Sequence, residues 1–158
     1  MKAAPPRVLV VETSPEVLAD RIEDFTAAGK GWINVLPEIP EDVPVPPTPT
    51  AFAVFSKRGP LVPLATWTAP TSSGRHREPA QVGVHHGLGR SAAKFLADTE
   101  AAIPPTWRVV QDHPRRGLVI AVPPDVAPMT VAQWIFTMLS ELCIPPRTQY
   151  YEMFVYPG

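Results

Sequence analysis

Residues 107–122, WRVVQDHPRRGLVIAV, hold two strand patterns separated by a short polar turn. The first strand is expected over 107–111. The second is expected over 118–122, because a nearly continuous aliphatic run is typical of a strand buried inside a sheet. Proline and glycine within 112–117 suit a tight reversal of the chain. The segment therefore predicts an antiparallel hairpin with its second strand in the interior of a sheet.

The segments around this hairpin predict a strand, helix, strand, strand, helix, strand order across 81–156. The further elements are a strand at 81–86 (QVGVHH), a helix at 91–102, a helix opening with a Thr130–Gln133 capping box and ending at Pro145, and a strand at 149–156 (QYYEMFVY). This is the ferredoxin-like order, in which the strands at 81–86 and 118–122 are central. We expect an α+β fold with an antiparallel or mixed sheet and with helices packed on it.

The first part of the chain predicts an extension of that sheet or a cover for its open face. A strand is expected at 7–11, then a helix from a Thr13–Glu16 capping box to Gly29, and a strand at 32–36. Two β-type runs, 51–55 and 61–67, flank a turn that contains Gly59 and predict a hairpin.

The 158 residues predict a single domain with three parts. These parts are an N-terminal unit at 1–69, a mobile loop at 70–80 and the ferredoxin-like unit at 81–156. Six of the 22 prolines fall in 37–49, which must run extended as a stiff connector or as a docking site for a partner. Other prolines follow predicted elements, so the excess of proline marks element boundaries.

Composition excludes several classes of protein. A hydrophobic fraction of 45% allows a real core, and a net charge of −1 excludes a globally basic nucleic-acid binder. The N-terminal apolar run is too short for a signal peptide, and the longest apolar stretch, 118–139, is broken by Asp125, Gln133 and three prolines. A single cysteine, Cys143, is expected in the core and forms no internal disulfide. A cytoplasmic protein without a membrane partner is expected.

The predicted topology brings three loops to one end of the sheet. These loops contain the candidate ligand-binding residues His86, Gly87, Gly89, Arg90, His113, Arg115, Arg116 and Arg147. A glycine-rich turn into a helix N-terminus favours an anion, because free N–H groups and the helix dipole both attract negative charge. The charge distribution also favours an anion at this end. Residues 1–50 hold four basic and eight acidic residues, whereas residues 51–158 hold ten basic and seven acidic residues. Alternatively, these arginines are simply solvated at loop tips.

Residues 87–92 (GLGRSA) also fit the GxGxx(G/A) dinucleotide pattern. The short hairpin after the next strand argues against this interpretation, because a dinucleotide fold needs a crossover helix there. RNA recognition through aromatic stacking fails as well, since Leu118, Ile120 and Val122 offer no stacking platform.

No motif assigns a catalytic residue, a metal or a cofactor. His85 and His86 are adjacent on a strand and point to opposite faces, so one ion cannot bind both. The chain has no HExxH motif, no paired cysteines and no GxSxG elbow.

The strand-to-helix segment 84–90, VHHGLGR, resembles the phosphate-binding loop of the acylphosphatases, which share the ferredoxin-like order. The resemblance covers 81–156 and implies that Arg90 holds a phosphate. That family also orients water with an asparagine on its second strand, and residues 107–110 (WRVV) contain no amide.

The sequence thus predicts a non-catalytic binding or interaction module. Its basic rim, formed by Arg90, Arg115, Arg116 and Arg147, would receive an anionic small molecule or an acidic partner surface. A homodimer through the exposed C-terminal strand is a further expectation, and nucleic acid is not expected as a partner. The alternative is an acylphosphatase-like or other phosphate-substrate enzyme, in which Arg90 holds the anion and His86 or His113 transfers protons.

Overall fold

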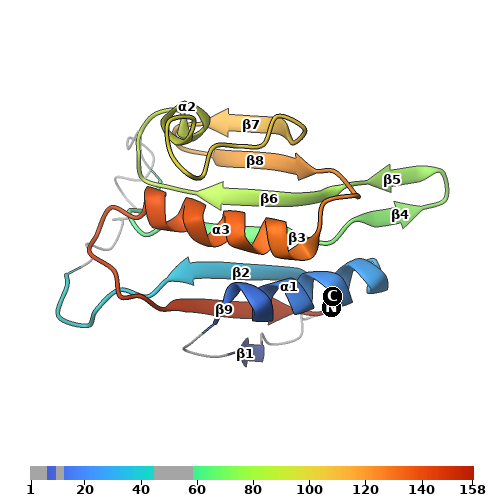
Figure 1. The fold of residues 1–158 in the computed structure, drawn as a ribbon, viewed down its shortest axis with the longest axis horizontal. Coiled ribbons are helices and arrows are strands. Elements are labelled where there is room, and N and C mark those ends of the chain that lie inside the picture. The colour runs from blue at the N-terminus through green and yellow to red at the C-terminus, as the bar shows by residue number, and fades with distance from the viewer. Residues whose placement is uncertain (1–6, 10–12, 45–58) are drawn as a thin grey trace.

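The computed structural model describes residues 7–9, 13–44 and 59–158, which form an α+β fold around one large sheet. The sheet has seven strands in the order β1-β9-β2-β3-β6-β8-β7, and every neighbouring pair is antiparallel (Figure 1). Its strands are β1 (Arg7–Leu9), β2 (Trp32–Pro37), β3 (Leu64–Thr68), β6 (Ala80–His85), β7 (Arg108–His113), β8 (Gly117–Val122) and β9 (Tyr151–Tyr156).

The expected chain order of strand, helix, strand, strand, helix, strand in 81–156 is found, but these strands do not form a continuous ferredoxin-like sheet. Such a sheet would place β9 beside β6, but β2 and β3 lie between them. Four strand spacings therefore separate β8 from β9, roughly 19 Å at the usual spacing. Two helices side by side need a sheet of about this width. The N-terminal strands β2 and β3 are thus inserted into the middle of the sheet. The sequence predicted only that this part of the chain extends the sheet or covers its open face.

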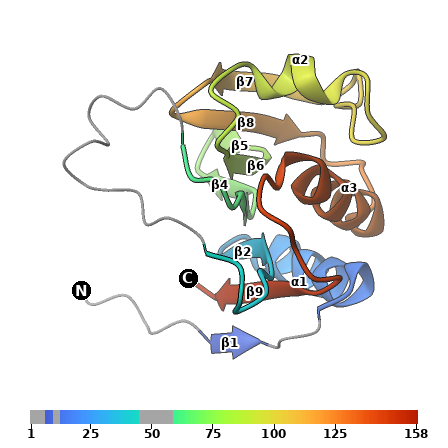
Figure 2. The ribbon, with the colours of Figure 1, turned by 90° about the vertical axis from the view of Figure 1, so that its left-hand side faces the viewer.

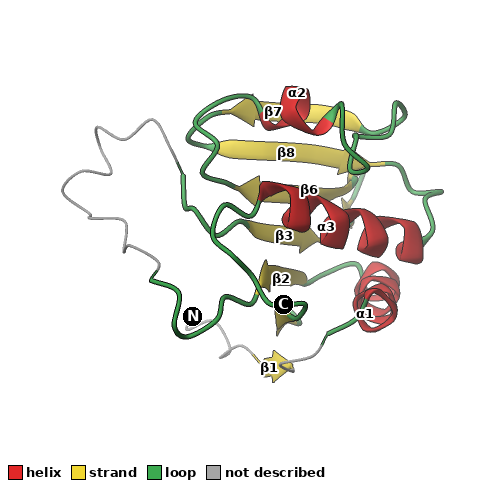
Figure 3. Cartoon of the chain, turned by 60° about the vertical axis from the view of Figure 1, so that its left-hand side comes forward, coloured by secondary structure: helices red, strands yellow, loops and turns green. Residues whose placement is uncertain are grey.

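The three helices in the described part of the chain lie on the same face of the sheet (Figures 2 and 3). They are α1 (Pro15–Ala28), α2 (Ala92–Leu96) and α3 (Pro128–Leu142). Alternate residues of each central strand point into this layer and are buried, as period-two alternation requires. The buried strand residues include Ile33, Val35, Ala65, Trp67, Val82, Val84, Leu118, Ile120, Met153 and Val155. Leu18 and Ile22 of α1 and Ile135 and Leu139 of α3 complete the core.

Both long helices begin differently from the capping-box predictions. α1 is capped by Ser14, whose Oγ accepts the Val17 N–H at 3.3 Å, while Thr13 is buried and donates to Met153 Sδ at 3.9 Å. α3 begins at Pro128 after Ala127, with no side-chain cap. Proline suits this first position, because its fixed φ is helical and it has no N–H to satisfy. Neither expected box forms.

The segment expected as a loop at 70–80 contains a small separate hairpin, β4 (Thr71–Ser73) with β5 (His76–Glu78). It extends beyond the end of the main sheet, and its residues are exposed (Figure 1). The helix expected at 91–102 is shorter than predicted and gives way to turns after Leu96. Of the other predicted hairpin, residues 51–55 lie outside the described residues, and the partner strand starts at Leu64.

The C-terminal strand is not a free edge. β9 pairs with β2 along its whole length and with β1 at 153–155, so the exposed strand expected for dimerisation is interior. Of the proline-rich segment, Pro37 ends β2 opposite Tyr151, and residues 45–49 lie outside the described residues. In the part of the chain that the structure describes, no helix has the length and apolar character to cross a bilayer.

Candidate functional site

The end of the sheet that carries the predicted site holds three loops. β6 ends at His85 beside Leu64, the β7–β8 turn closes between His113 and Gly117, and β9 starts at Tyr151. The loop after β6 contacts the end of β7 through Ser91 and Asp112. Arg147 is at the same end, but β2 and β3 separate its strand from β6 by roughly 14 Å at the usual strand spacing. We call this region the basic end.

The N-terminus of α2 already holds a negative charge from the protein itself. Asp112 Oδ1 accepts the Ala92 N–H at 3.1 Å, and Ser91 Oγ donates to Asp112 Oδ2. Ser91 Oγ also accepts the Lys94 N–H at 3.1 Å. The amides expected to bind an external anion therefore bond to groups of the chain. The anion site at this position stays a prediction that requires Asp112 to move aside.

Two of the candidate arginines make interactions within the fold. The Arg90 guanidinium stacks over the Phe95 ring, 5.1 Å from its centre. The Arg147 side chain donates to Ser140 Oγ at 2.5 Å and to the Thr148 carbonyl at 2.9 Å, and it lies 5.5 Å from the Tyr151 ring centre. Arg115 and Arg116 are exposed at the turn. The four arginines therefore do not converge on one point.

The two candidate histidines have structural partners. His113 Nδ1 accepts the backbone N–H groups of Arg115 and Arg116, at 3.1 and 3.0 Å, and so organises the turn. His86 is only 1% exposed, and its Nδ1 accepts the Leu88 N–H at 3.4 Å, which places the proton on Nε2. Nε2 has no partner among the described residues. Burial lowers the pKa of His86, and the negative charge of Asp112 partly opposes this shift. His86 is therefore a neutral imidazole that is shielded from solvent.

The two candidate glycines differ in exposure. Gly87 is buried against the backbone of Pro60 and Leu61. Gly89 is partly exposed and has a φ of 68°, as a tight turn requires. Together with the buried His86, these positions make the loop a packed structural turn.

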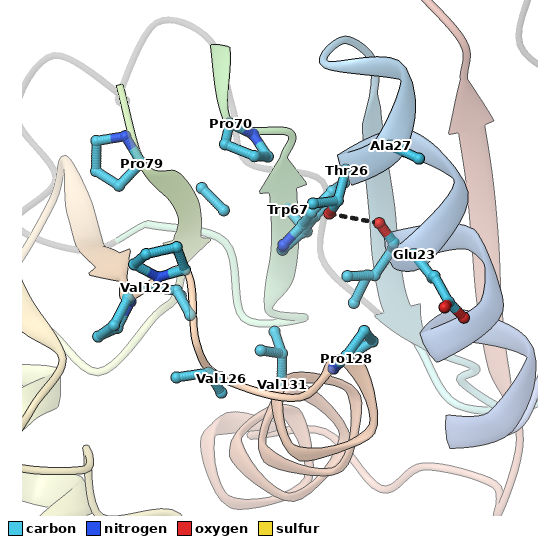
Figure 4. A pocket seen from close by; sticks show the side chains of 14 residues that line it. Glu23, Thr26, Ala27, Trp67, Pro70, Pro79, Val122, Val126, Pro128 and Val131 are labelled. Atoms are coloured by element: carbon cyan, nitrogen blue, oxygen red, sulfur yellow. Dashed lines mark hydrogen bonds between the residues drawn. The ribbon is translucent and has the colours of Figure 1, made fainter. Parts of the chain in front are cut away.

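The opposite end of the sheet contains a cavity of about 360 Å³ on the helical face (Figure 4). It lies between the second half of α1, the ends of β3 and β8, the start of β6 and the first turn of α3. The lining residues are Ile22, Glu23, Thr26, Ala27, Trp67, Pro70, Pro79, Ala80, Val122, Pro123, Pro124, Val126, Pro128 and Val131. The wall is therefore mainly apolar, and five prolines stiffen its rim. We call this cavity the proline pocket.

Trp67 supplies the donor of the proline pocket. Its side chain is 1% exposed, and its indole N–H makes no hydrogen bond within the described residues. The Thr26 hydroxyl, another donor on the wall, bonds to the Ile22 carbonyl at 2.6 Å (Figure 4). The indole nitrogen is not among the buried unpartnered side-chain atoms of the described residues, which are Glu38 Oε2 and His86 Nε2, so it is open to solvent. The pocket thus offers an apolar space with one donor for an incoming oxygen or nitrogen.

A second, more polar hollow of about 650 Å³ borders the proline pocket, and the two share Thr26, Ala27, Pro70, Pro79 and Pro124. The remaining wall is formed by the end of α1 and by the β4–β5 hairpin. These further lining residues are Ala28, Gly29, Thr71, Ser72, Arg77 and Glu78. The proline pocket and this second hollow form one groove with an apolar end and a polar end.

Sequence reasoning missed this groove, although its prolines were visible as element boundaries. Pro70, Pro79 and Pro123 are far apart in the chain, and only the order of strands brings them together. Comparison with protein-family models, with curated proteins and with solved structures finds no match. Function must therefore be inferred from the residues and their geometry. In the described part of the chain, no cluster of three histidine, cysteine or acidic side chains could hold a metal ion.

Proposed function

We propose that this protein is a non-catalytic binding module for a small, mainly apolar molecule, held in the proline pocket. The observation that carries the proposal is the apolar cavity itself, with the Trp67 indole in its wall. Ligand pockets typically occupy roughly 300–1,000 Å³, with mostly apolar walls and a few polar groups that orient the ligand. The proline pocket, at about 360 Å³, has this size and composition.

Rigidity of the rim supports the proposal. Proline fixes φ, so Pro70, Pro79, Pro123, Pro124 and Pro128 restrict the backbone around the opening. A pocket that needs no ordering on binding loses less conformational entropy when the ligand enters. At the basic end, by contrast, Ser91, Asp112 and the Nδ1 atom of His113 already bond to groups of the chain.

The test is a titration of protein with ¹⁵N-labelled tryptophan by 4-phenylbutan-1-ol, followed through the four indole N–H signals. The Trp67 signal is expected to move, because the alcohol oxygen accepts its N–H. Trp134 is the internal control, since its Nε1–H already donates to the Ala101 carbonyl at 3.1 Å. Equal shifts of both signals, or none, would contradict the proposal.

A cavity-filling variant makes the test specific. Val131 lines the pocket, so Val131→Phe should occupy the space and remove the Trp67 response. Val119, on the strand face without helices, offers a matched control, because Val119→Phe adds the same bulk outside the pocket and should leave the response intact. Ala80→Val is a milder filling variant for the case in which Val131→Phe does not fold.

A further inference from the structure

The face of the sheet opposite the helices takes no part in the core or in the proline pocket. Within the described residues, no helix packs on it (Figure 2). Its side chains are the alternate residues of β2, β3, β6, β7, β8 and β9 that do not point into the core. The larger apolar ones, all at least partly exposed, are Trp32, Leu36, Leu64, Val119, Phe154 and Tyr156. We call this surface the open face.

The open face carries little charge for a surface in contact with water. A well-solvated surface has about 25–35% Lys, Arg, Glu and Asp. On these six strands, the described residues place two such side chains on the open face, Glu152 on β9 and Arg108 on β7. Trp32 is 37% exposed and stacks on Tyr156, with ring centres 5.0 Å apart. An apolar, aromatic and weakly charged surface is typical of the core of a protein interface.

The glycine at the centre of the open face, Gly83, is not required by the fold of a single chain. It pairs with Thr66 on β3 and with Val119 on β8. A Cβ built on it would have its nearest described neighbour, the Thr66 carbonyl oxygen, at 4.0 Å. Glycine weakens the interior of a strand and often marks a place where another chain approaches closely. Gly83 thus leaves room at the centre of the open face for a side chain of another molecule.

The two charges of the open face have opposite signs and lie at opposite corners. Glu152 is near the start of β9, at the basic end, whereas Arg108 begins β7 beside Ala121, at the end with the proline pocket. Five strand spacings separate β9 from β7, roughly 24 Å at the usual spacing, so the two side chains cannot pair within one chain. A surface with this pattern is complementary to itself, because a two-fold axis can place each charge against the opposite charge of another copy.

We propose that the open face binds a second copy of this chain, so that two sheets pack face to face in a symmetric dimer. The two-fold axis lies between the sheets and crosses the line from Glu152 to Arg108 at a right angle. Glu152 of each copy then lies opposite Arg108 of the partner subunit, and this pair forms twice. The inference is independent of the proline pocket, which lies on the helical face.

The open face is large enough for a stable dimer. Six strands at a spacing of about 4.8 Å, with up to six residues at a rise of about 3.3 Å, give a flat area of roughly 550 Å² per copy. Two copies thus cover roughly 1,100 Å², above the roughly 1,000 Å² of total buried surface that a specific interface needs. Packed sheets lie about 10 Å apart, so the side chains of the two faces can interdigitate.

Sedimentation velocity of the full chain at rising micromolar concentrations tests the proposal. The mass is expected to rise from that of one copy to that of two. Glu152→Arg should weaken dimerisation roughly tenfold, because the symmetry applies the like-charge contact twice. Arg108→Glu should do the same, and the double variant, which exchanges the charges, should return the affinity to within about threefold of the wild type. Because the two positions are too far apart to interact within one chain, this rescue reports a contact between copies.

Two further variants separate the open face from general effects. Glu141→Arg makes the same change of charge on an exposed position of α3, away from the open face, and should leave the affinity unchanged. Gly83→Val tests the face without a change of charge. Its Cβ has space in a single chain and valine favours strands, so the stability of the monomer to urea should not fall. The added bulk should weaken dimerisation roughly tenfold, as overpacking of an interface would.

The mass of one copy throughout the concentration range would overturn the proposal. A dimer that Glu152→Arg, Arg108→Glu and Gly83→Val all leave unchanged would also overturn it, because a different surface would then hold the copies together. A dimer that each single charge change weakens and that the double variant does not restore would overturn the pairing of Glu152 with Arg108 of the partner subunit.

Discussion

The two ends of the sheet differ in the space that they leave for a ligand. At the basic end, Asp112 occupies the start of α2, Arg90 lies on Phe95 and His113 accepts two backbone N–H groups of its own turn. At the proline end, Trp67 lies in the wall of an apolar cavity of about 360 Å³. A rich set of charged residues is therefore a weaker sign of a binding site than a space that admits a ligand.

Two glycine substitutions should give the largest difference between the ends. Gly117 has a φ of 92°, and a Cβ there would clash with the Val84 carbonyl oxygen, so Gly117→Ala combines strain with a backbone clash. We expect a loss of about 4 kcal/mol in the free energy of unfolding. Gly74, in the β4–β5 turn, has a φ of 60° with open space around it, so Gly74→Ala should cost about 1 kcal/mol. Urea unfolding measures both, and equal losses would show that the basic end is not the more tightly packed.

Removing the charge of Asp112 should reopen the basic end to anions. Asp112→Asn weakens the bonds to Ser91 and Ala92, with an expected loss of about 1–2 kcal/mol. Added phosphate should then raise the melting temperature of the variant more than that of the wild type.

The wild type is the control that judges the original anion prediction. A clear rise of its melting temperature in phosphate, abolished by Arg90→Ala with Arg115→Ala, would show that Asp112 does not exclude anions. The basic rim would then be a ligand-binding site, as the sequence predicted.

The buried imidazole at the basic end should make stability depend on pH. The folded pKa of His86 lies below its ordinary value of 6.5, so between these two values the unfolded chain binds more protons. Stability is therefore complete above pH 6.5 and falls with pH toward the folded pKa, by at most about 1.4 kcal/mol per pH unit. His86→Leu should remove this slope in urea unfolding at pH 5 to 8. His76→Gln, in the exposed hairpin, should keep it, and a slope unchanged in His86→Leu would contradict the assignment.

The smallest expected effect tests the single donor of the proline pocket. Trp67→Phe keeps a ring and removes the N–H, so 4-phenylbutan-1-ol should bind roughly fivefold more weakly, as the loss of one neutral hydrogen bond implies. Calorimetry measures the affinity. An unchanged affinity would mean that the ligand does not use the indole N–H and that the pocket binds by apolar contact alone.

Much of the fold was predictable because its signals are local. The aliphatic run at 118–122 forms β8 in the interior of the sheet, as expected, and the Pro145 region follows the end of α3. The position of β2 and β3 was not predictable in this way, since no local pattern states which strand β9 joins. The neighbour of β9 depends on the width of sheet that α1 and α3 need when they lie side by side.

The candidate sites show the same limit. The loops of His86, Arg90 and His113 do lie at one end of the sheet, but the partners that close them, Asp112 and Phe95, are ordinary residues in the sequence. The proline pocket was hidden for the opposite reason. Its prolines are recognisable in the sequence as the ends of helices and strands. That they lie together around one pocket is visible only in the folded chain.

The position of β9 in the sheet also affects the order in which strands can pair during synthesis. Within the described residues, β1 joins the sheet through β9, which also completes β2, so an early strand of the chain depends on a late one. Chains emerge at roughly 5–20 residues per second. For several seconds β2 therefore has an open edge that β9 will later fill, and closing so long a loop is slow compared with local folding. During synthesis this open edge needs protection from aggregation.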